Sequence, residues 1–210
     1  MQRISIRTEA EQEAALDEAV RTVLAGGTLV FPTDTLYGLG CNGLEPGALG
    51  RVFDIKRRSY TQALPLLVRD VRWARELAHV DERRERLLAE LWPGRVTFIL
   101  TRKDIVPSAA AGGGTTIALR APDHPFAQEL LRRAGYPLCG TSANVSGQPS
   151  SQNPDVIMQG FAPFTFKPDL VLDAGILPPS EPSTVVDLSG PTPRITRQGA
   201  VRADRILPLL

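Results

Sequence analysis

Residues 28–40 read TLVFPTDTLYGLG, an apolar run followed directly by a turn-rich segment. The run Thr28–Phe31 predicts a buried strand, because it shows no alternation of polar and apolar residues, and Pro32 ends it. The hydroxyl and carboxyl groups of Thr33–Thr35 then follow the strand end, where α/β sheets commonly hold ligands. The same residues also suit an ordinary Asx or Thr turn in which glycines supply positive φ angles. The segment therefore indicates an α/β sheet and leaves the role of the loop open.

Further helices and strands are predicted on both sides of this segment. Apolar spacing and capping residues predict helices from the capping box at Thr8 to Gly26, and over 49–58, 70–77, 81–92 and 126–134. Short apolar runs predict strands over 64–68, 96–100, 116–119, 137–140, 170–173, 184–188 and 194–197. Because helices and strands mix without strict βαβ alternation, we expect an α/β fold around a twisted mixed sheet with flanking helices.

Length and composition exclude several protein classes. With 210 residues, 42% of them hydrophobic and 22% charged, the chain predicts a single domain over 1–210 that needs no metal or disulfide. No apolar run approaches the roughly 18 residues of a membrane span, and the N-terminus lacks a signal-peptide core, so we expect a cytoplasmic protein without membrane contact. Cys41 and Cys139 lie far apart and form no CxxC pattern, which predicts free thiols. The net charge of +1 argues against nonspecific nucleic-acid binding as the main task.

The common catalytic and phosphate-binding motifs are absent from the sequence. It contains no GxxxxGK[ST] or GxGxxG loop, no HExxH pair and no GxSxG nucleophile. His79 and His124 each stand alone, which is typical of surface or capping histidines rather than metal ligands. The candidate chemistry therefore rests on hydroxyl groups and cations in loops.

Two cations at the end of a predicted helix form the first candidate site. Lys56 and Arg58 there complement the helix dipole, and this alone would explain them. Alternatively, the lysine point charge and the arginine fork form a phosphate clamp. Convergence of the two side chains on one anion would require the backbone to extend between them.

Arg120 ends the apolar segment TTIALRAP and is the second candidate. Thr116 shares its strand face, since residues four apart point to the same side. A guanidinium among apolar residues needs a partner, which is either an internal carboxylate or a ligand anion. The residues alone leave both alternatives open.

The segment TSANVSGQPSS, residues 141–151, is the third candidate. Small hydroxyl residues and glycine allow backbone N–H groups to approach phosphates closely, although an ordinary polar loop has the same composition. Together the three candidates indicate an anion- or nucleotide-binding α/β domain without the usual phosphate loops.

Nearly the whole chain, to about Arg197, resembles the threonylcarbamoyl-AMP synthases of the YrdC-like family. The segments that carry the resemblance occur in the family's order: PTDTLYGLG at 32–40, Lys56-x-Arg58, WPGRVTFIL at 92–100, ALRAPDHP at 118–125, SANVSGQPS at 142–150 and EPSTVVD at 181–187. The chain departs from the family pattern at Ser59, Gln62 and Ala63, where the family usually has Pro, a polar or basic residue, and Pro. The length corresponds to the short, single-domain form of the family.

The resemblance implies a YrdC-like fold, with its mixed sheet open over a concave basic cavity. It also implies a nucleotidyltransferase that converts L-threonine, bicarbonate and ATP with Mg²⁺ to threonylcarbamoyl-AMP and pyrophosphate. The product would pass to the transferase complex that forms threonylcarbamoyladenosine in tRNA. Two alternatives remain, an RNA-binding YrdC-like paralogue and a carbamoyl-adenylating domain without threonine specificity.

The resemblance further implies a set of site residues. Threonine would contact Thr35, Arg120, Ser183 and the backbone at Gly140. ATP would contact Lys56, Arg58, Gln62, Thr116, Ser142, Asn144, Ser150 and Arg197. Lys56 and Arg58 would be catalytic because they would carry charge on the phosphates, and Mg²⁺ would come with ATP rather than be held by dedicated protein ligands.

Overall fold

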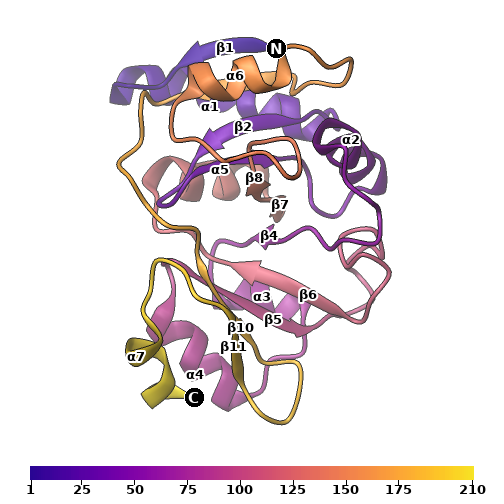
Figure 1. The fold of residues 1–210 in the computed structure, drawn as a ribbon, viewed down its shortest axis with the longest axis vertical. Coiled ribbons are helices and arrows are strands. Elements are labelled where there is room, and N and C mark those ends of the chain that lie inside the picture. Colours follow the sequence, from indigo (N-terminus) through magenta and orange to yellow (C-terminus); the bar gives the residue numbers. More distant parts are fainter.

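Two mixed sheets form the centre of the molecule, whereas the sequence predicts one. The computed structural model describes all residues from 1 to 210, and its sheets have the strand orders β1-β9-β2-β3-β8 and β11-β10-β5-β6-β4-β7 (Figure 1). The strands are β1 Gln2–Ser5, β2 Leu29–Pro32, β3 Tyr37–Gly40, β4 Leu66–Leu67, β5 Val96–Thr101, β6 Thr116–Arg120, β7 Leu138–Cys139, β8 Thr141–Ser142, β9 Leu170–Asp173, β10 Thr184–Asp187 and β11 Arg194–Arg197.

The chain crosses from one sheet to the other at Gly140. The run 137–140, predicted as one strand, contains β7, which pairs with β4 in the six-stranded sheet. Strand β8 begins just after it at Thr141 and pairs with β3 in the five-stranded sheet. A Cβ atom at Gly140 would lie 2.4 Å from Cγ of Leu67. Only glycine therefore allows the backbone to pass this closely between the sheets.

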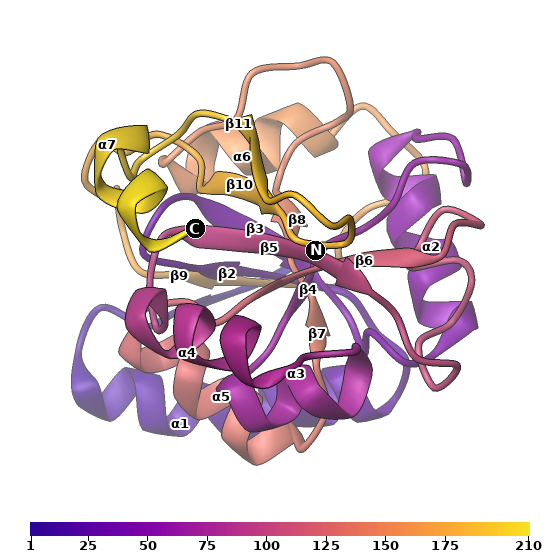
Figure 2. The same ribbon diagram turned by 90° about the horizontal axis from the view of Figure 1, so that it is seen from below.

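Seven α-helices surround the sheets. They are α1 Glu9–Leu24, α2 Pro46–Lys56, α3 Val71–Leu77, α4 Glu82–Leu91, α5 Pro125–Ala134, α6 Pro154–Phe161 and α7 Ala203–Ile206, and a short 3-10 helix covers Leu207–Leu209. Figure 2 shows α1, α3, α4 and α5 as one layer on one side of the sheets, with α6 and α7 on the opposite side. No helix has both the length and the apolar character that crossing a membrane requires.

The predicted helix boundaries are confirmed where capping side chains mark them. Thr8 and Glu11 form a complete capping box at the start of α1. Asp70 and Asp81 accept hydrogen bonds from the first-turn amides of α3 and α4. Gly135 ends α5 with a φ of 72°, in the left-handed region that favours glycine. Local hydrogen bonding therefore sets these ends.

The interpretation of 32–40 as a turn-rich segment is wrong for its second half. Residues Tyr37–Gly40 form strand β3, which pairs antiparallel with β2 in a hairpin. A Cβ atom at Gly40 would lie 2.7 Å from the ring of Phe31 and 2.5 Å from the carbonyl oxygen of Cys139. The glycine therefore makes room for neighbouring groups instead of supplying a positive φ angle. Strands β1 and β8 and helices α6 and α7 were also not predicted.

Two apolar cores hold these layers together. In one, α1 and α5 pack on the five-stranded sheet through buried residues that include Leu16, Val23, Leu130 and Phe31. The other is the larger core and includes side chains of α2, β3 and β5. Close packing in these cores makes the two sheets rigid. The sheets therefore hold the loops that connect their strands in fixed positions.

Candidate functional site

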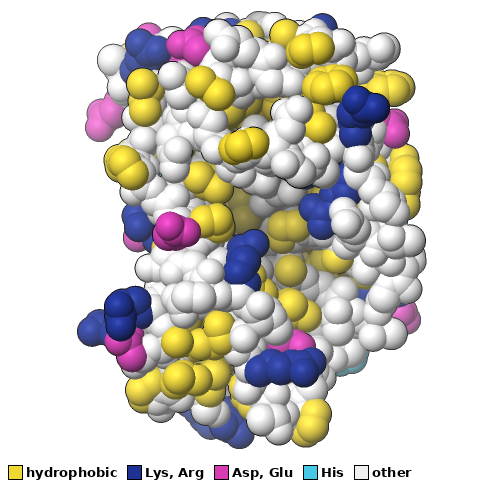
Figure 3. Space-filling model, in the orientation of Figure 1, with side chains coloured by type: hydrophobic (Ala, Val, Ile, Leu, Met, Phe, Trp, Pro, Cys, Tyr) yellow, Lys and Arg dark blue, Asp and Glu magenta, His cyan; other side chains and the backbone are white.

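A cavity of about 430 Å³ lies between the two sheets, and it opens as a hollow in the middle of the face shown in Figure 3. The loop after β2 and strands β3 and β8 contribute one part of its lining, and β4, β5, β6, β10 and β11 contribute the other. Arg58, Arg120 and Arg197 are among the lining residues, and no aspartate or glutamate is. The lining therefore presents cationic and hydroxyl groups toward the cavity.

Most of the residues predicted for the site meet at this cavity. Its lining includes Thr35, Arg58, Arg120, Gly140, Ser142, Ser150, Ser183 and Arg197. The lining does not include Lys56, Gln62, Thr116 and Asn144. Segments that are far apart in the sequence thus converge on one space.

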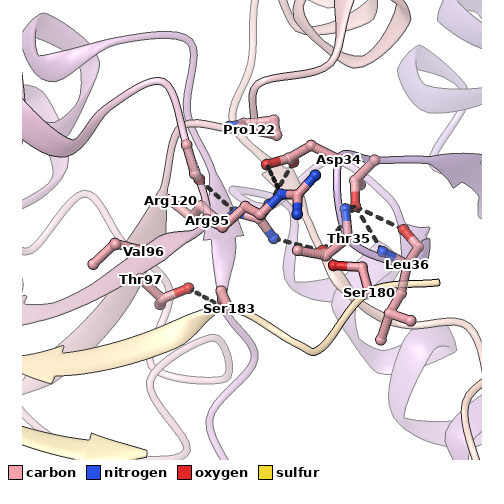
Figure 4. A network of polar contacts seen from close by, with 12 residues as sticks. Asp34, Thr35, Leu36, Arg95, Val96, Thr97, Arg120, Pro122, Ser180 and Ser183 are labelled. Carbon is pink, nitrogen blue, oxygen red and sulfur yellow. Dashed lines mark hydrogen bonds and ion pairs between the residues drawn. The ribbon is translucent and has the colours of Figure 1, made fainter. Parts of the chain in front are cut away.

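Arg120 is buried, and each of its three nitrogens donates a hydrogen bond within the protein (Figure 4). Nε donates to the carbonyl oxygen of Gly94 at 2.9 Å, Nη1 donates to Oγ1 of Thr35 at 2.9 Å, and Nη2 donates to Oδ1 of Asp34. Burial lowers the pKa of Arg120, and the Asp34 carboxylate opposes this effect. Of the two alternatives for Arg120, the structure therefore shows the internal carboxylate.

Asp34 keeps one oxygen without a hydrogen bond. Oδ2 is buried and has no hydrogen-bond partner, and Nε of Arg95 lies 3.9 Å from it. The neighbouring Thr33 and Thr35 turn inward, with their Oγ1 atoms 3.1 Å apart. Thr33 also donates from Oγ1 to the carbonyl oxygen of Leu36 at 2.7 Å. This turn fixes the Thr35 hydroxyl beside the Arg120 guanidinium.

Ser183 lines the cavity and contacts residues of β5 and β11. Its Oγ lies 2.7 Å from Oγ1 of Thr97. Ser183 directly precedes β10, whose parallel pairing with β5 places Val185 opposite Thr97. Arg197 on β11 donates from Nη2 to the carbonyl oxygen of Ser183 at 2.8 Å and to its Oγ at 3.3 Å. Burial lowers the pKa of Arg197. The Ser183 hydroxyl therefore lies between a neutral hydroxyl and a guanidinium.

Lys56 and Arg58 point to different places because α2 ends between them. Lys56 is the last helical residue, and Arg57 has a left-handed backbone with φ 52° and ψ 45°. This turn directs Lys56 into the protein, where it is 2% exposed, and Arg58 to the cavity. The extended backbone that convergence of these cations would require is absent.

Arg58 keeps most of its donors free. Its Nη2 donates to the carbonyl oxygen of Ala63 at 2.9 Å, and its buried Nε has no hydrogen-bond partner. Burial lowers the pKa of Arg58. A guanidinium with unused N–H groups at a cavity wall can receive an anion.

Hydrogen bonds within the segment 142–148 and to neighbouring residues hold it in place. Ser142 donates from Oγ to Oδ1 of Asn144 at 2.6 Å, and Asn144 donates from Nδ2 to the carbonyl oxygen of Gln148 at 2.5 Å. The backbone N–H groups of Ala143 and Ser146 bond to carbonyl oxygens of Tyr37 and Lys56. These amides are therefore occupied, and the Ser142 side chain is what the segment presents to the cavity.

Thr116 and Gln62 lie outside the cavity lining for different reasons. Thr116 begins β6, and the side chains of Ala118 and Arg120 on the same strand face line the cavity, so Thr116 lies beyond its edge. Gln62 is exposed in the loop after α2, where its N–H bonds to the carbonyl oxygen of Ser59.

Several lining residues were not singled out from the sequence. Thr97 is one: it is 6% exposed within the strand Val96–Thr101, and a hydroxyl between apolar residues in such a strand is the signal that could have found it. Leu67 and Val185 also line the cavity, and nothing distinguishes them from core residues in the sequence. No group of three or more His, Cys, Asp or Glu side chains could hold a metal ion.

The chain is similar in sequence to several known proteins. The sequence profile of the Sua5–YciO–YrdC family, described as "Telomere recombination", matches residues 21–199. A Pyrococcus abyssi protein named threonylcarbamoyl-AMP synthase is 31% identical over 97% of this chain and 59% of its own length, so the chain spans about three fifths of that relative.

Two solved structures have the same fold. Pyrococcus abyssi Sua5 complexed with L-threonine has a TM-score of 0.90 at 30% identity and covers 100% of this chain, which in turn covers 60% of Sua5. Escherichia coli YciO has a TM-score of 0.87 at 30% identity, and 98% of each chain is covered. The YciO match therefore extends over both chains nearly end to end.

Proposed function

Because this chain belongs to the Sua5–YciO–YrdC family, we propose that it is a threonylcarbamoyl-AMP synthase. The reaction converts L-threonine, bicarbonate and MgATP to threonylcarbamoyl-AMP and pyrophosphate. One observation carries the proposal: all four residues expected to bind threonine and four of the eight expected to bind the nucleotide line one cavity. The name of the Pyrococcus abyssi relative and the L-threonine in the Sua5 structure support the same activity.

The threonine end of the cavity is built around Arg120. A guanidinium has five N–H donors, and internal contacts use one on each nitrogen, so one remains on Nη1 and one on Nη2. These two donors can bind the threonine carboxylate, while Asp34 and Thr35 hold the guanidinium in place. The Ser183 hydroxyl is available for the polar atoms of threonine.

The nucleotide end is built around Arg58 and Arg197, and Ser142 and Ser150 line the same cavity. Arginine forks match phosphate oxygens in geometry as well as in charge. The unpartnered Nε of Arg58 is an unused donor that a phosphate oxygen would satisfy.

The chemistry requires no nucleophile from the protein. Threonine and bicarbonate give a carbamate with loss of water, and a carbamate oxygen attacks the α-phosphorus of ATP. The bond from that phosphorus to the bridging oxygen breaks, and pyrophosphate leaves. The chain aligns the two substrates and stabilises charge on the phosphates, which are the main contributions that proteins make to phosphoryl transfer.

Mg²⁺ would enter as part of MgATP. The cavity lining offers no carboxylate, and no cluster of metal-ligating side chains exists elsewhere, so the residues do not form a protein-held magnesium site. We assign no step of the reaction to residues that hold this ion. The product would serve the transferase complex that modifies adenosine in tRNA.

Pyrophosphate release from MgATP tests the proposal. We expect release only when both threonine and bicarbonate are present, and mass spectrometry should find threonylcarbamoyl-AMP. Release without threonine would instead indicate a carbamoyl-adenylating domain. Absence of release together with strongly salt-dependent RNA binding would indicate an RNA-binding paralogue.

A further inference from the structure

Lys56 is the only buried lysine of the chain, and the protein itself uses all of its ammonium donors. The other lysines, Lys103 and Lys167, are partly exposed. An ammonium group has three N–H donors. Nζ of Lys56 has acceptors at 2.7 Å in the carbonyl oxygen of Ser142, and at 2.9 Å and 3.1 Å in the carbonyl oxygen and Oδ1 of Asn144.

These contacts join the end of α2 to the segment 142–148 at more than one point. The carbonyl oxygen of Lys56 accepts the backbone N–H of Ser146 at 2.9 Å, so main chain and side chain of Lys56 hold the same segment. Oδ1 of Asn144 accepts from Lys56 and from Oγ of Ser142. The position of the Ser142 hydroxyl at the cavity thus depends on atoms that Lys56 fixes.

We propose that Lys56 is a positioning residue that holds the segment 142–148, and that Arg58 alone of these two cations contacts phosphate. The second part rests on the proposed function, whereas the first does not. A phosphate contact by Nζ would require breaking a buried hydrogen bond and leaving a Ser142 or Asn144 oxygen without its donor. Arg58, with an unpartnered Nε at the cavity, faces no such cost.

Amide hydrogen exchange of the ligand-free full chain tests the first part. Lys56→Met keeps an unbranched side chain of similar length but removes all three donors. We expect the amides of Ala143, Ser146 and Gln148 to exchange about tenfold faster or more, as loss of charge-assisted hydrogen bonds predicts. Amides of β5 and β6, which belong to the other sheet, should keep their exchange rates. Unchanged exchange at 143–148 would overturn the proposal.

Two control variants sharpen this experiment. Lys103→Met removes an ammonium that donates to the carbonyl oxygen of Arg75 at 2.6 Å, outside the cavity, and should leave 143–148 unchanged. Arg58→Met removes the neighbouring cation and should also leave these amides unchanged, whereas acceleration equal to that of Lys56→Met would overturn the proposal. If Lys56→Met does not fold, Asn144→Ala removes one acceptor of Nζ, and normal exchange at Ser146 and Gln148 in that variant would overturn the proposal.

The salt dependence of ATP affinity, measured by calorimetry, tests the second part. A cation that touches phosphate contributes to the decrease of affinity with salt, so Arg58→Met should flatten this dependence. Lys56→Met should weaken ATP binding and leave the slope unchanged. Lys56→Met and Asn144→Ala should be non-additive, since both act through one segment. Equal flattening by Lys56→Met and Arg58→Met would overturn the assignment. If the wild type does not bind ATP, the proposed function fails, and the exchange result still decides the role of Lys56.

Discussion

Arg120 and Asp34 form an ion pair between two buried side chains, which are 8% and 6% exposed. They come from β6 in the six-stranded sheet and from the loop after β2 in the five-stranded sheet, so the pair links both sides of the cavity. The pair therefore has two consequences: it contributes to the stability of the fold, and it orients the guanidinium that we propose for the threonine carboxylate.

Removing the carboxylate should destabilise the protein. Asp34→Ala leaves a buried guanidinium without its counter-ion, which typically costs about 3–5 kcal/mol. Urea unfolding should show this decrease in the free energy of unfolding. Asp123, an exposed carboxylate three residues after Arg120, provides the control. Asp123→Ala should change the free energy of unfolding by less than about 0.5 kcal/mol. Equal stability of the two variants would argue that solvent replaces Asp34 as the partner of Arg120.

Arg120→Lys should weaken threonine binding and leave ATP binding nearly unchanged. An ammonium cannot contact Thr35, Asp34 and a ligand carboxylate with the fixed geometry of a guanidinium. The proposed ATP contacts, among them Arg58 and Arg197, are separate side chains of the lining. Separate titrations of threonine and ATP by calorimetry check this expectation. An equal loss for both ligands would return Arg120 to a purely structural role.

Arg58→Ala should remove most pyrophosphate release while the protein stays folded. Loss of a charge-assisted hydrogen bond costs about 1.5–3 kcal/mol, or roughly 10- to 150-fold in rate. Arg72→Ala on α3 is the control, because that side chain is 81% exposed and its one ion-pair distance is 3.8 Å. Turnover of a folded Arg58→Ala variant at the wild-type rate would contradict the phosphate contact.

Selection of threonine over serine should be modest, and rejection of valine should be stronger. Serine keeps the hydroxyl that Thr35 and Ser183 can bind and lacks one methyl group, which is worth about 1–3 kcal/mol. Valine has no hydroxyl and would lose the hydrogen bonds that these residues can make with the ligand. Competition assays with serine and valine measure both effects. If valine competes as well as serine does, the polar groups do not contact the threonine side chain.

Lys56 should make stability rise with pH in mildly alkaline solution. Burial, with the positive charge of Arg58, lowers the pKa of Lys56 to about 8 from an ordinary value of 10.5. Between these values the unfolded chain binds the additional proton, so the free energy of unfolding increases as pH rises. Lys56→Met should lack this increase.

Urea unfolding of wild type and Lys56→Met at pH 8 and pH 10 measures the difference. Tyr37, whose pKa burial raises to about 12, has the opposite effect above pH 10, and it is present in both proteins and cancels. A parallel pH dependence of the two proteins would show that Lys56 keeps its ordinary pKa.

Local features of the fold could be predicted from the sequence. The ends of α1, α3, α4 and α5 follow from capping residues that bond within one turn, so Thr8, Asp70, Asp81 and Gly135 mark them correctly. Strand β3 was missed because its glycines at 38 and 40 mimic a turn, and only the packing of Phe31 shows why they are there. The division into two sheets depends on pairing between distant segments, which periodicity does not report.

The candidate site divides in the same way. Arg120 could be identified as a residue that needs a partner, but the choice of Asp34 required the position of the opposite sheet. The separation of Lys56 from Arg58 depends on the left-handed backbone of Arg57. Residues other than glycine seldom adopt this conformation, so it could not be predicted from an arginine in the sequence. The eight cavity-lining site residues come from segments joined only by long-range pairing, so their convergence had to come from the resemblance or from the structure.

The passage of the chain between the sheets at Gly140 has a consequence for the size of ligand that the cavity accepts. At this point the two walls are joined by covalent bonds, and neighbouring Cα atoms are held about 3.8 Å apart by the peptide unit. Covalent geometry thus fixes the distance between the two walls at this point, and no repacking of side chains can enlarge it. The width of the cavity is therefore fixed beside Gly140, and a change in that width requires movement of the walls farther from this residue.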